Sequence, residues 1–224
     1  VMVQKKDKGT GVKVRIKTPE NITLVTAEQY ANAAITAGVT DAEIEVAAVS
    51  KVTGESALTG VYKAFEANGV QLDAKRTEVA QQELEVTNKI AQENANQKGF
   101  DSSKLDKAMI EIKKELAELK QKQGQLATKE DIERIINDAL KNNSLQNVIS
   151  KDQINALVAF AQNYQNTSAI DSKQVLEQLN SLSKSVGEKT NSLVEQAKNE
   201  GWLDKIAQFF TSIFENIKNL FNQQ

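Results

Sequence analysis

The sequence predicts an α+β protein that is predominantly helical, with a small βαβα region followed by a helical bundle. Three observations carry this prediction. Alternation of apolar and polar residues, which is typical of strands, occurs only in the N-terminal quarter of the chain. Amphipathic helical periodicity then continues through the rest of the 224 residues. Only 5% of the residues are aromatic although 40% are hydrophobic, which favours slender helix packing over one large core.

Residues 1–70 predict a small region in which strands and helices alternate. Val12, Val14 and Ile16 alternate with charged residues, as in a half-buried strand. The predicted order is a strand at residues 12–17, a helix at 26–38, a strand at 41–49 and a helix at 54–69. The two strands are expected to be parallel neighbours joined by a right-handed crossover. Because two strands make a marginal sheet, we expect further strands from upstream of Val1 or from another chain.

Residues 71–199 predict successive helices separated by polar turns. The expected helices cover residues 72–97, a segment with an apolar seam, segments that begin at Thr128 and at Ser150, and residues 171–199. The seam has a 4,3 spacing over two heptads, which suits packing along another helix, and consists of Leu105, Met109, Ile112, Leu116 and Leu119. Residues 200–224 are predicted to form a third region after 1–70 and 71–199, an amphipathic aromatic helix.

This C-terminal segment carries the only tryptophan and four of the seven phenylalanines of the chain. On a helical projection its apolar side chains fall within an arc of about 140° that excludes every charged residue. Three candidates could bury this apolar face, namely the core of the protein itself, a membrane surface and a second copy of the chain. The residues predicted to contact a membrane or a partner are Trp202, Ile206, Phe209, Phe210, Ile213, Phe214, Ile217 and Phe221.

Composition argues against enzymatic function. The chain contains no histidine and no cysteine, so the commonest general base and the commonest metal ligands are missing. Paired acids do occur, as Glu43 with Glu45 and at the helix start Glu130, Asp131 and Glu133, but strand neighbours and helix-dipole partners explain them. No phosphate-binding, metalloprotease or nucleophile-elbow motif is present. We therefore expect no enzyme activity, no catalytic residues, no metal and no cofactor.

Charge also limits the choice of partners. A net charge of −2 gives no long-range positive field for phosphates, so nucleic acid is not an expected partner. Basic residues do crowd the N-terminus, and a run of this kind is usually a solvated edge strand. The run consists of Lys5, Lys6, Lys8, Lys13, Arg15 and Lys17. Hydropathy reveals no stretch of about 18 apolar residues, the length that a membrane-spanning helix needs.

The segment Val25–Glu66 resembles the YpuA-like secreted proteins of Gram-positive bacteria, a family of unknown function. The resemblance lies in Val25-Thr26 at the start of the first predicted helix, in the end of that helix at Ala37-Gly38-Val39, in the strand at Asp41 and in the stretch Ala57-Leu58-Thr59-Gly60. It continues more weakly through Gln81-Glu83-Leu84 and through residues 151–158, and it covers roughly two thirds of the chain.

The resemblance implies export, because members of that family typically carry a signal peptide and a further portion that would precede Val1. We therefore expect an exported, non-enzymatic binding or structural protein associated with the cell envelope. Two alternatives stay open, a membrane-active protein that uses its C-terminal helix and a hydrolase with an unrecognised site. A membrane surface, a protein partner and a second copy of the chain are all expected partner classes.

Overall fold

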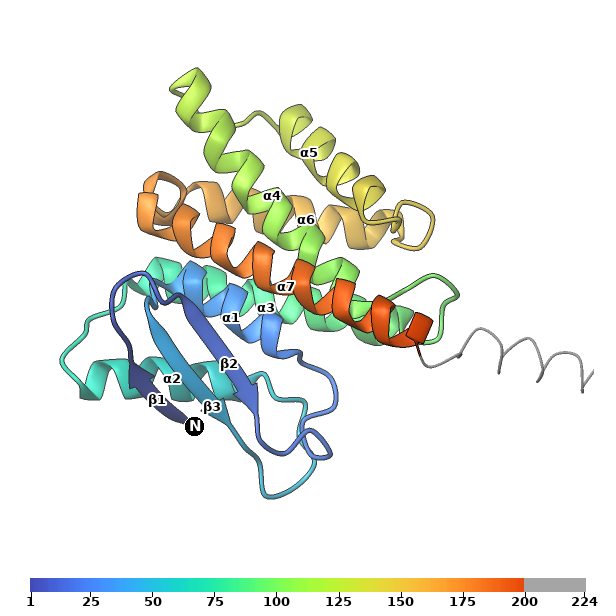
Figure 1. Ribbon diagram of the computed structural model, residues 1–224. Coiled ribbons are helices and arrows are strands. Elements are labelled where there is room, and N and C mark those ends of the chain that lie inside the picture. Colours follow the sequence, from blue (N-terminus) through green and yellow to red (C-terminus); the bar gives the residue numbers. More distant parts are fainter. Residues whose placement is uncertain (200–224) are drawn as a thin grey trace, which may run out of the picture. The chain divides into compact units, whose positions relative to one another are not determined.

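The computed structural model describes the backbone of residues 1–199 and the side chains of residues 1–188. The chain divides into two compact units, Val1–Lys184 and Ser185–Gln224. The account below concerns the first of these units, which contains the sheet and the helices that pack with it (Figure 1). The structure is α+β and predominantly helical, as the sequence predicts.

The sheet contains the strands β1 Met2–Lys5, β2 Val12–Ile16 and β3 Ala42–Val46, in the order β1-β3-β2. Strands β2 and β3 are parallel neighbours, with Val14 opposite Ile44, which confirms the predicted pairing. The expectation that extra strands must come from outside the chain is wrong, since β1 pairs antiparallel with β3. This strand is only four residues long, with two apolar residues followed by two polar ones, so it has no alternation to detect.

Helix α1 Ala27–Ala37 lies between the sheet and the helical part of the chain. It packs on β2 on one side and on α3 Ala74–Asn94 on the other. Residues 29–37 are all buried, and four of them are alanines that allow close approach on every side. The helix starts at a capping box of Thr26 and Gln29 and ends at Gly38, whose φ is 103°. Both ends match the predicted boundaries.

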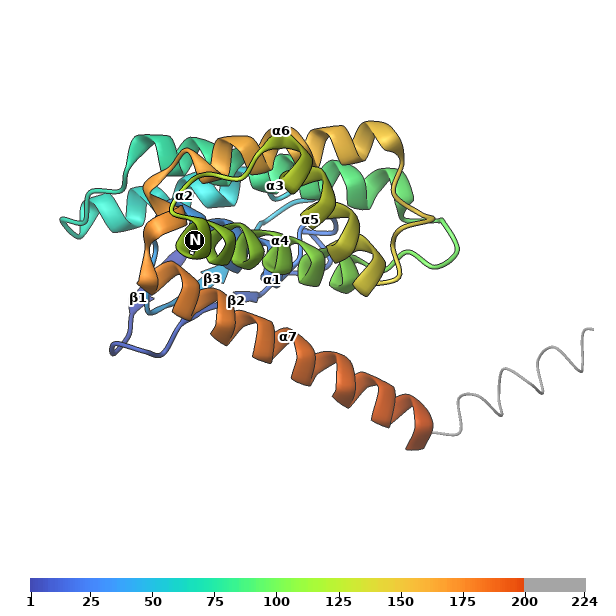
Figure 2. The same cartoon turned by 90° about the horizontal axis from the view of Figure 1, so that it is seen from above.

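The remaining helices are α2 Ser56–Ala67, α4 Ser102–Gln123, α5 Lys129–Asn142, α6 Lys151–Gln165, the 3₁₀ helix η1 Ser168–Asp171 and α7 Lys173–Asn199. Helix α2 contacts β1. Helices α3 and α6 run side by side, and α4 packs against α5 (Figures 1 and 2). Capping boxes start α5 at Thr128 and α6 at Ser150.

The predicted seam on α4 is part of the core. Leu105, Met109, Ile112 and Leu116 are at most 1% exposed, while Leu119 near the end of the helix is half-buried. The heptad spacing therefore identified a helix that packs along others, namely α5 and, more briefly, α1 and α6. Among the helices in the described part of the chain, none is long and apolar enough to cross a membrane.

Candidate functional site

The residues that the sequence predicts as membrane or partner contacts lie outside the described residues. They are Trp202, Ile206, Phe209, Phe210, Ile213, Phe214, Ile217 and Phe221. Candidate sites within Val1–Lys184 must therefore be built from other side chains. Two features stand out there, a buried cluster of ionised groups and a charged face of the sheet.

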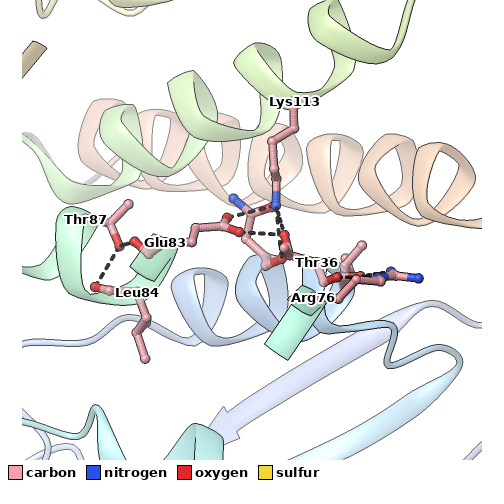
Figure 3. A network of polar contacts seen from close by, with 8 residues as sticks. Thr36, Arg76, Glu83, Leu84, Thr87 and Lys113 are labelled. Carbon is pink, nitrogen blue, oxygen red and sulfur yellow. Dashed lines mark hydrogen bonds and ion pairs between the residues drawn. The ribbon is translucent and has the colours of Figure 1, made fainter. Parts of the chain in front are cut away.

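The buried cluster joins three helices through Lys113 of α4. Its ammonium donates to Glu83 Oε1 at 2.8 Å, to Thr36 Oγ1 at 2.9 Å and to the carbonyl of Asn32 at 3.1 Å (Figure 3). The Thr36 hydroxyl in turn donates to Glu83 Oε2 at 2.5 Å. Every donor of the ammonium thus has an acceptor, which a buried lysine requires.

Arg76 extends this cluster to the C-terminal end of α1. Its Nε donates to the carbonyl of Thr36 at 2.7 Å, and its Nη2 donates to the carbonyl of Ile35 at 3.0 Å. These carbonyls lie in the last turn of α1, where helical partners are missing and where the helix dipole favours a cation. Arg76 therefore completes the end of α1 from the neighbouring helix α3.

Burial prevents the cluster from acting on a ligand. The side chains of Lys113 and Glu83 are 0% and 2% exposed. Burial lowers the pKa of Lys113, and the carboxylate of Glu83 opposes that shift. The ring of Tyr164 lies 5.7 Å from the ammonium, and burial raises the pKa of this tyrosine. A reacting group would need an opening to this site, so the arrangement serves to position α1, α3 and α4.

A second buried acid, Asp106 of α4, contacts the start of α1. The hydroxyl of Thr26 donates to Asp106 Oδ2 at 2.9 Å, and the side chain of Gln29 also acts as a hydrogen-bond partner of this carboxyl group. Burial raises the pKa of Asp106 to about 7, although the hydrogen bond from Thr26 acts in the opposite direction. This carboxyl group can therefore change its charge near neutral pH inside the core.

The charged face of the sheet points away from α1 and α2. We call it the basic sheet face, and it consists of Lys6, Lys13, Arg15, Lys17, Glu43 and Glu45. Glu43 forms ion pairs with Arg15 at 2.6 Å and Lys6 at 3.0 Å, and Glu45 pairs with Lys17 at 3.5 Å. The hydrogen bond from Lys6, together with the nearby cations, lowers the pKa of Glu43. Four cations therefore face two carboxylates.

The predicted solvated edge strand is confirmed in β2. Lys13 and Arg15 are exposed on this strand and Lys17 directly after it, and the strand forms one edge of the sheet. Glu43 and Glu45 lie on the same face of β3, as expected, and their partners are these basic residues. Each of the two acids is therefore one half of an ion pair on this face of the sheet.

The sequence patterns did not predict the buried cluster of Lys113 and Glu83. A signal for Lys113 was available, because it lies four residues after Met109 and three before Leu116 and so falls on the apolar seam. Likewise, Glu83 follows Val79 by four residues and precedes Leu84. A charged residue at a seam position predicts a buried partner on a neighbouring helix.

Comparison with known proteins gives a family but no function. Residues 1–182 match a family described as "Protein of unknown function (DUF1002)". The uncharacterized protein YpuA of Bacillus subtilis (strain 168) is 33% identical over 218 residues, which span 96% of this chain and 67% of YpuA. A comparison with solved structures finds no match. The chain therefore belongs to the DUF1002 family, as its resemblance to the YpuA-like proteins predicts.

Proposed function

We propose that the protein is a non-enzymatic binding module that works outside the cytoplasm at the cell envelope, where its basic sheet face contacts an anionic membrane surface. The observation that carries the proposal is the excess of cations on this face. The side chains of Arg15 and Lys17 are 62% and 56% exposed, so they can reach a surface. The side chains of Glu43 and Glu45 are only 18% and 24% exposed.

The charge of this face differs from that of the rest of the chain. Four cations against two carboxylates leave two positive charges on the face, whereas the whole chain has a net charge of −2. An anionic surface would therefore attract this side of the sheet and repel the remainder, which orients the molecule as well as binding it.

The non-enzymatic part of the proposal is supported by what the polar groups do. The buried ionisable groups hold helices together and are closed to solvent. In the described part of the chain no three acidic side chains lie close enough to hold a metal ion, and the sequence contains no histidine or cysteine. The extracytoplasmic part rests on the resemblance to secreted proteins.

Vesicle pelleting of the full-length protein tests the proposal. Binding to phosphatidylglycerol vesicles is expected to exceed binding to phosphatidylcholine vesicles and to weaken as salt screens the charges. The variant Lys13→Gln/Arg15→Gln/Lys17→Gln should bind phosphatidylglycerol up to about 100-fold more weakly, since each basic residue near such a surface contributes about 1 kcal/mol. These side chains are exposed, so the fold should persist, which circular dichroism checks.

A matched control removes three other exposed lysines. Lys89, Lys122 and Lys129 form only long ion pairs of 3.7–3.9 Å within their own helices, and their replacement by Gln changes the net charge equally. Binding of this control variant should stay close to that of the wild type. Equal losses in both variants, or no preference for phosphatidylglycerol, would contradict a specific role for the sheet face.

A second candidate is favoured by the composition of residues 200–224. The sequence places the only tryptophan and four of the seven phenylalanines there, which predicts a lipid-binding amphipathic helix. The variant Phe209→Ser/Phe214→Ser distinguishes the two candidates in the same assay. If this segment binds, the variant loses affinity for neutral vesicles as well, and the loss is insensitive to salt.

A further inference from the structure

Large apolar side chains are exposed mainly at one end of the sheet. Strand β1 begins at this end and strands β2 and β3 finish there, because Met2 lies opposite Glu45 and Ile16 lies opposite Val46. The loop that follows β3 continues beyond this end (Figure 1). Five large hydrophobic side chains are exposed in the described part of the chain, and four of them lie here. We call these four residues the apolar sheet end, which consists of Val1, Met2, Val49 and Val52.

The loop that carries Val49 has a fixed backbone. The N–H of Ala48 donates to Thr18 Oγ1 at 2.9 Å, and the carbonyl of Ala48 accepts from Asn21 Nδ2 at 2.7 Å. The N–H of Val52 donates to the carbonyl of Asn21 at 2.9 Å. These bonds join the loop to the segment that follows β2, on both sides of the fully exposed Val49. A surface that is ordered before binding loses little conformational freedom when it meets a partner.

Cations flank the apolar sheet end. Lys17 and Lys51 lie in the two joined segments, whereas Glu20 is the one acidic residue among residues 17–22 and 47–53. The side chain of Lys17 is 56% exposed, and this residue also belongs to the basic sheet face. The apolar sheet end is therefore continuous with the positive surface of the sheet. An exposed apolar patch with a polar rim is typical of an interaction site, and the charge of this rim complements an anionic partner.

We propose that the apolar sheet end inserts into an anionic lipid bilayer, with Val49 below the headgroups and with Lys17 and Lys51 level with them. This inference rests on the proposed function and specifies how the protein meets the membrane. Lysine stems can lie along apolar surface while their ammonium groups stay among the phosphates. Interfacial binding of this kind combines apolar burial with electrostatic attraction. A bilayer matches both properties of this end, whereas a purely apolar partner would leave the lysines without counter-ions.

A polarity-sensitive label at position 49 tests the insertion. The chain contains no cysteine, so the fluorophore NBD attached to Val49→Cys in the full-length protein reports from this position alone. Phosphatidylglycerol vesicles should increase its fluorescence and shift its emission to the blue. Leu126→Cys is the matched control, because Leu126 is also an exposed apolar residue in a loop. That loop joins α4 to α5, away from the sheet (Figure 1), so a label there should keep its emission.

Vesicle pelleting measures what the apolar side chain contributes. Val49→Ser should weaken binding to phosphatidylglycerol vesicles by about threefold to tenfold, as expected for losing the burial of one valine side chain. Val49→Trp should strengthen binding, because tryptophan favours the membrane interface. Leu126→Ser should bind like the wild type. The side chain of Val49 is fully exposed, so both replacements should fold, which circular dichroism checks.

The outcomes separate this inference from the proposed function. If the wild type binds and Lys13→Gln/Arg15→Gln/Lys17→Gln loses affinity, the proposed function stands. An unchanged label at position 49, together with wild-type affinity of Val49→Ser, would then overturn the insertion alone. Equal responses of the labels at positions 49 and 126 would also overturn it. So would a blue shift at position 49 that grows with protein concentration without vesicles, since a second copy would then cover this end. Absence of binding by the wild type would overturn both proposals.

Discussion

At the scale of single residues, the most consequential feature is Lys113, whose side chain is fully buried. Transfer of Lys113 and Glu83 into the core costs several kcal/mol for each charge, and their attraction offsets this cost only with good geometry. That geometry is present, because the ammonium has three acceptors and both carboxylate oxygens have donors. A pair of this kind favours one arrangement of α1, α3 and α4 over other apolar packings.

Removing one partner should therefore be far more damaging than removing both. Lys113→Met leaves Glu83 buried without its counter-ion, so the free energy of unfolding should fall by about 3–5 kcal/mol. In Lys113→Met/Glu83→Met the unpaired charge is gone, and Thr36 can still donate to the carbonyl of Asn32, so most of the loss should be recovered. Urea unfolding of both variants measures this difference. A double variant as unstable as the single one would show that the pair stabilises directly.

At the scale of secondary-structure elements, sequence patterns predicted the boundaries well where local chemistry decides them. The start of α1 at Thr26 and its end at Gly38 follow from side-chain capping and from a left-handed backbone, both of which are local. Strand β1 and the cluster at Lys113 could not be predicted in the same way. Their stability comes from partners distant in the chain, such as β3 for β1 and Glu83 for Lys113.

The turn before α2 depends on a single glycine. Gly54 is buried and has a φ of 100°, and a Cβ atom there would collide with the hydroxyl of Tyr30 and with a methyl group of Ile22. The same hydroxyl donates to the carbonyl of Gly54 at 2.5 Å, so the turn is tied to α1. Gly54→Ala should therefore lower the midpoint of thermal unfolding, through both backbone strain and lost packing.

Gly69→Ala provides the control for this prediction. Gly69 also has a positive φ, of 77°, but no atom lies within 4 Å of a Cβ added there. Its replacement should cost only the backbone strain, roughly 1 kcal/mol. Thermal unfolding followed by circular dichroism compares the two variants. Equal losses would mean that contact with Tyr30 and Ile22 contributes nothing beyond the strain.

At the scale of the whole molecule, the sheet and the helical layers share one core within Val1–Lys184, with α1 in contact with both. Asp106 lies at this junction, where it accepts a hydrogen bond from Thr26 at the start of α1. Burial raises its pKa, and the negative charges of Glu28 and Asp101 raise it further. The charge of one buried carboxyl group therefore affects how firmly the two parts hold together.

This position predicts an unusual dependence of stability on pH. The pKa of Asp106 is about 7 in the folded protein, against an ordinary value of 3.8 in the unfolded chain, so the folded state binds the extra proton between these values. Its stabilising contribution is complete below about pH 4 and is lost as the pH rises through 7, by roughly 4 kcal/mol at most. Asp106→Asn keeps an acceptor for Thr26 but cannot ionise. Urea unfolding between pH 4.5 and 8 should show wild-type stability falling relative to this variant. Parallel curves for the two proteins would place the pKa of Asp106 outside that range.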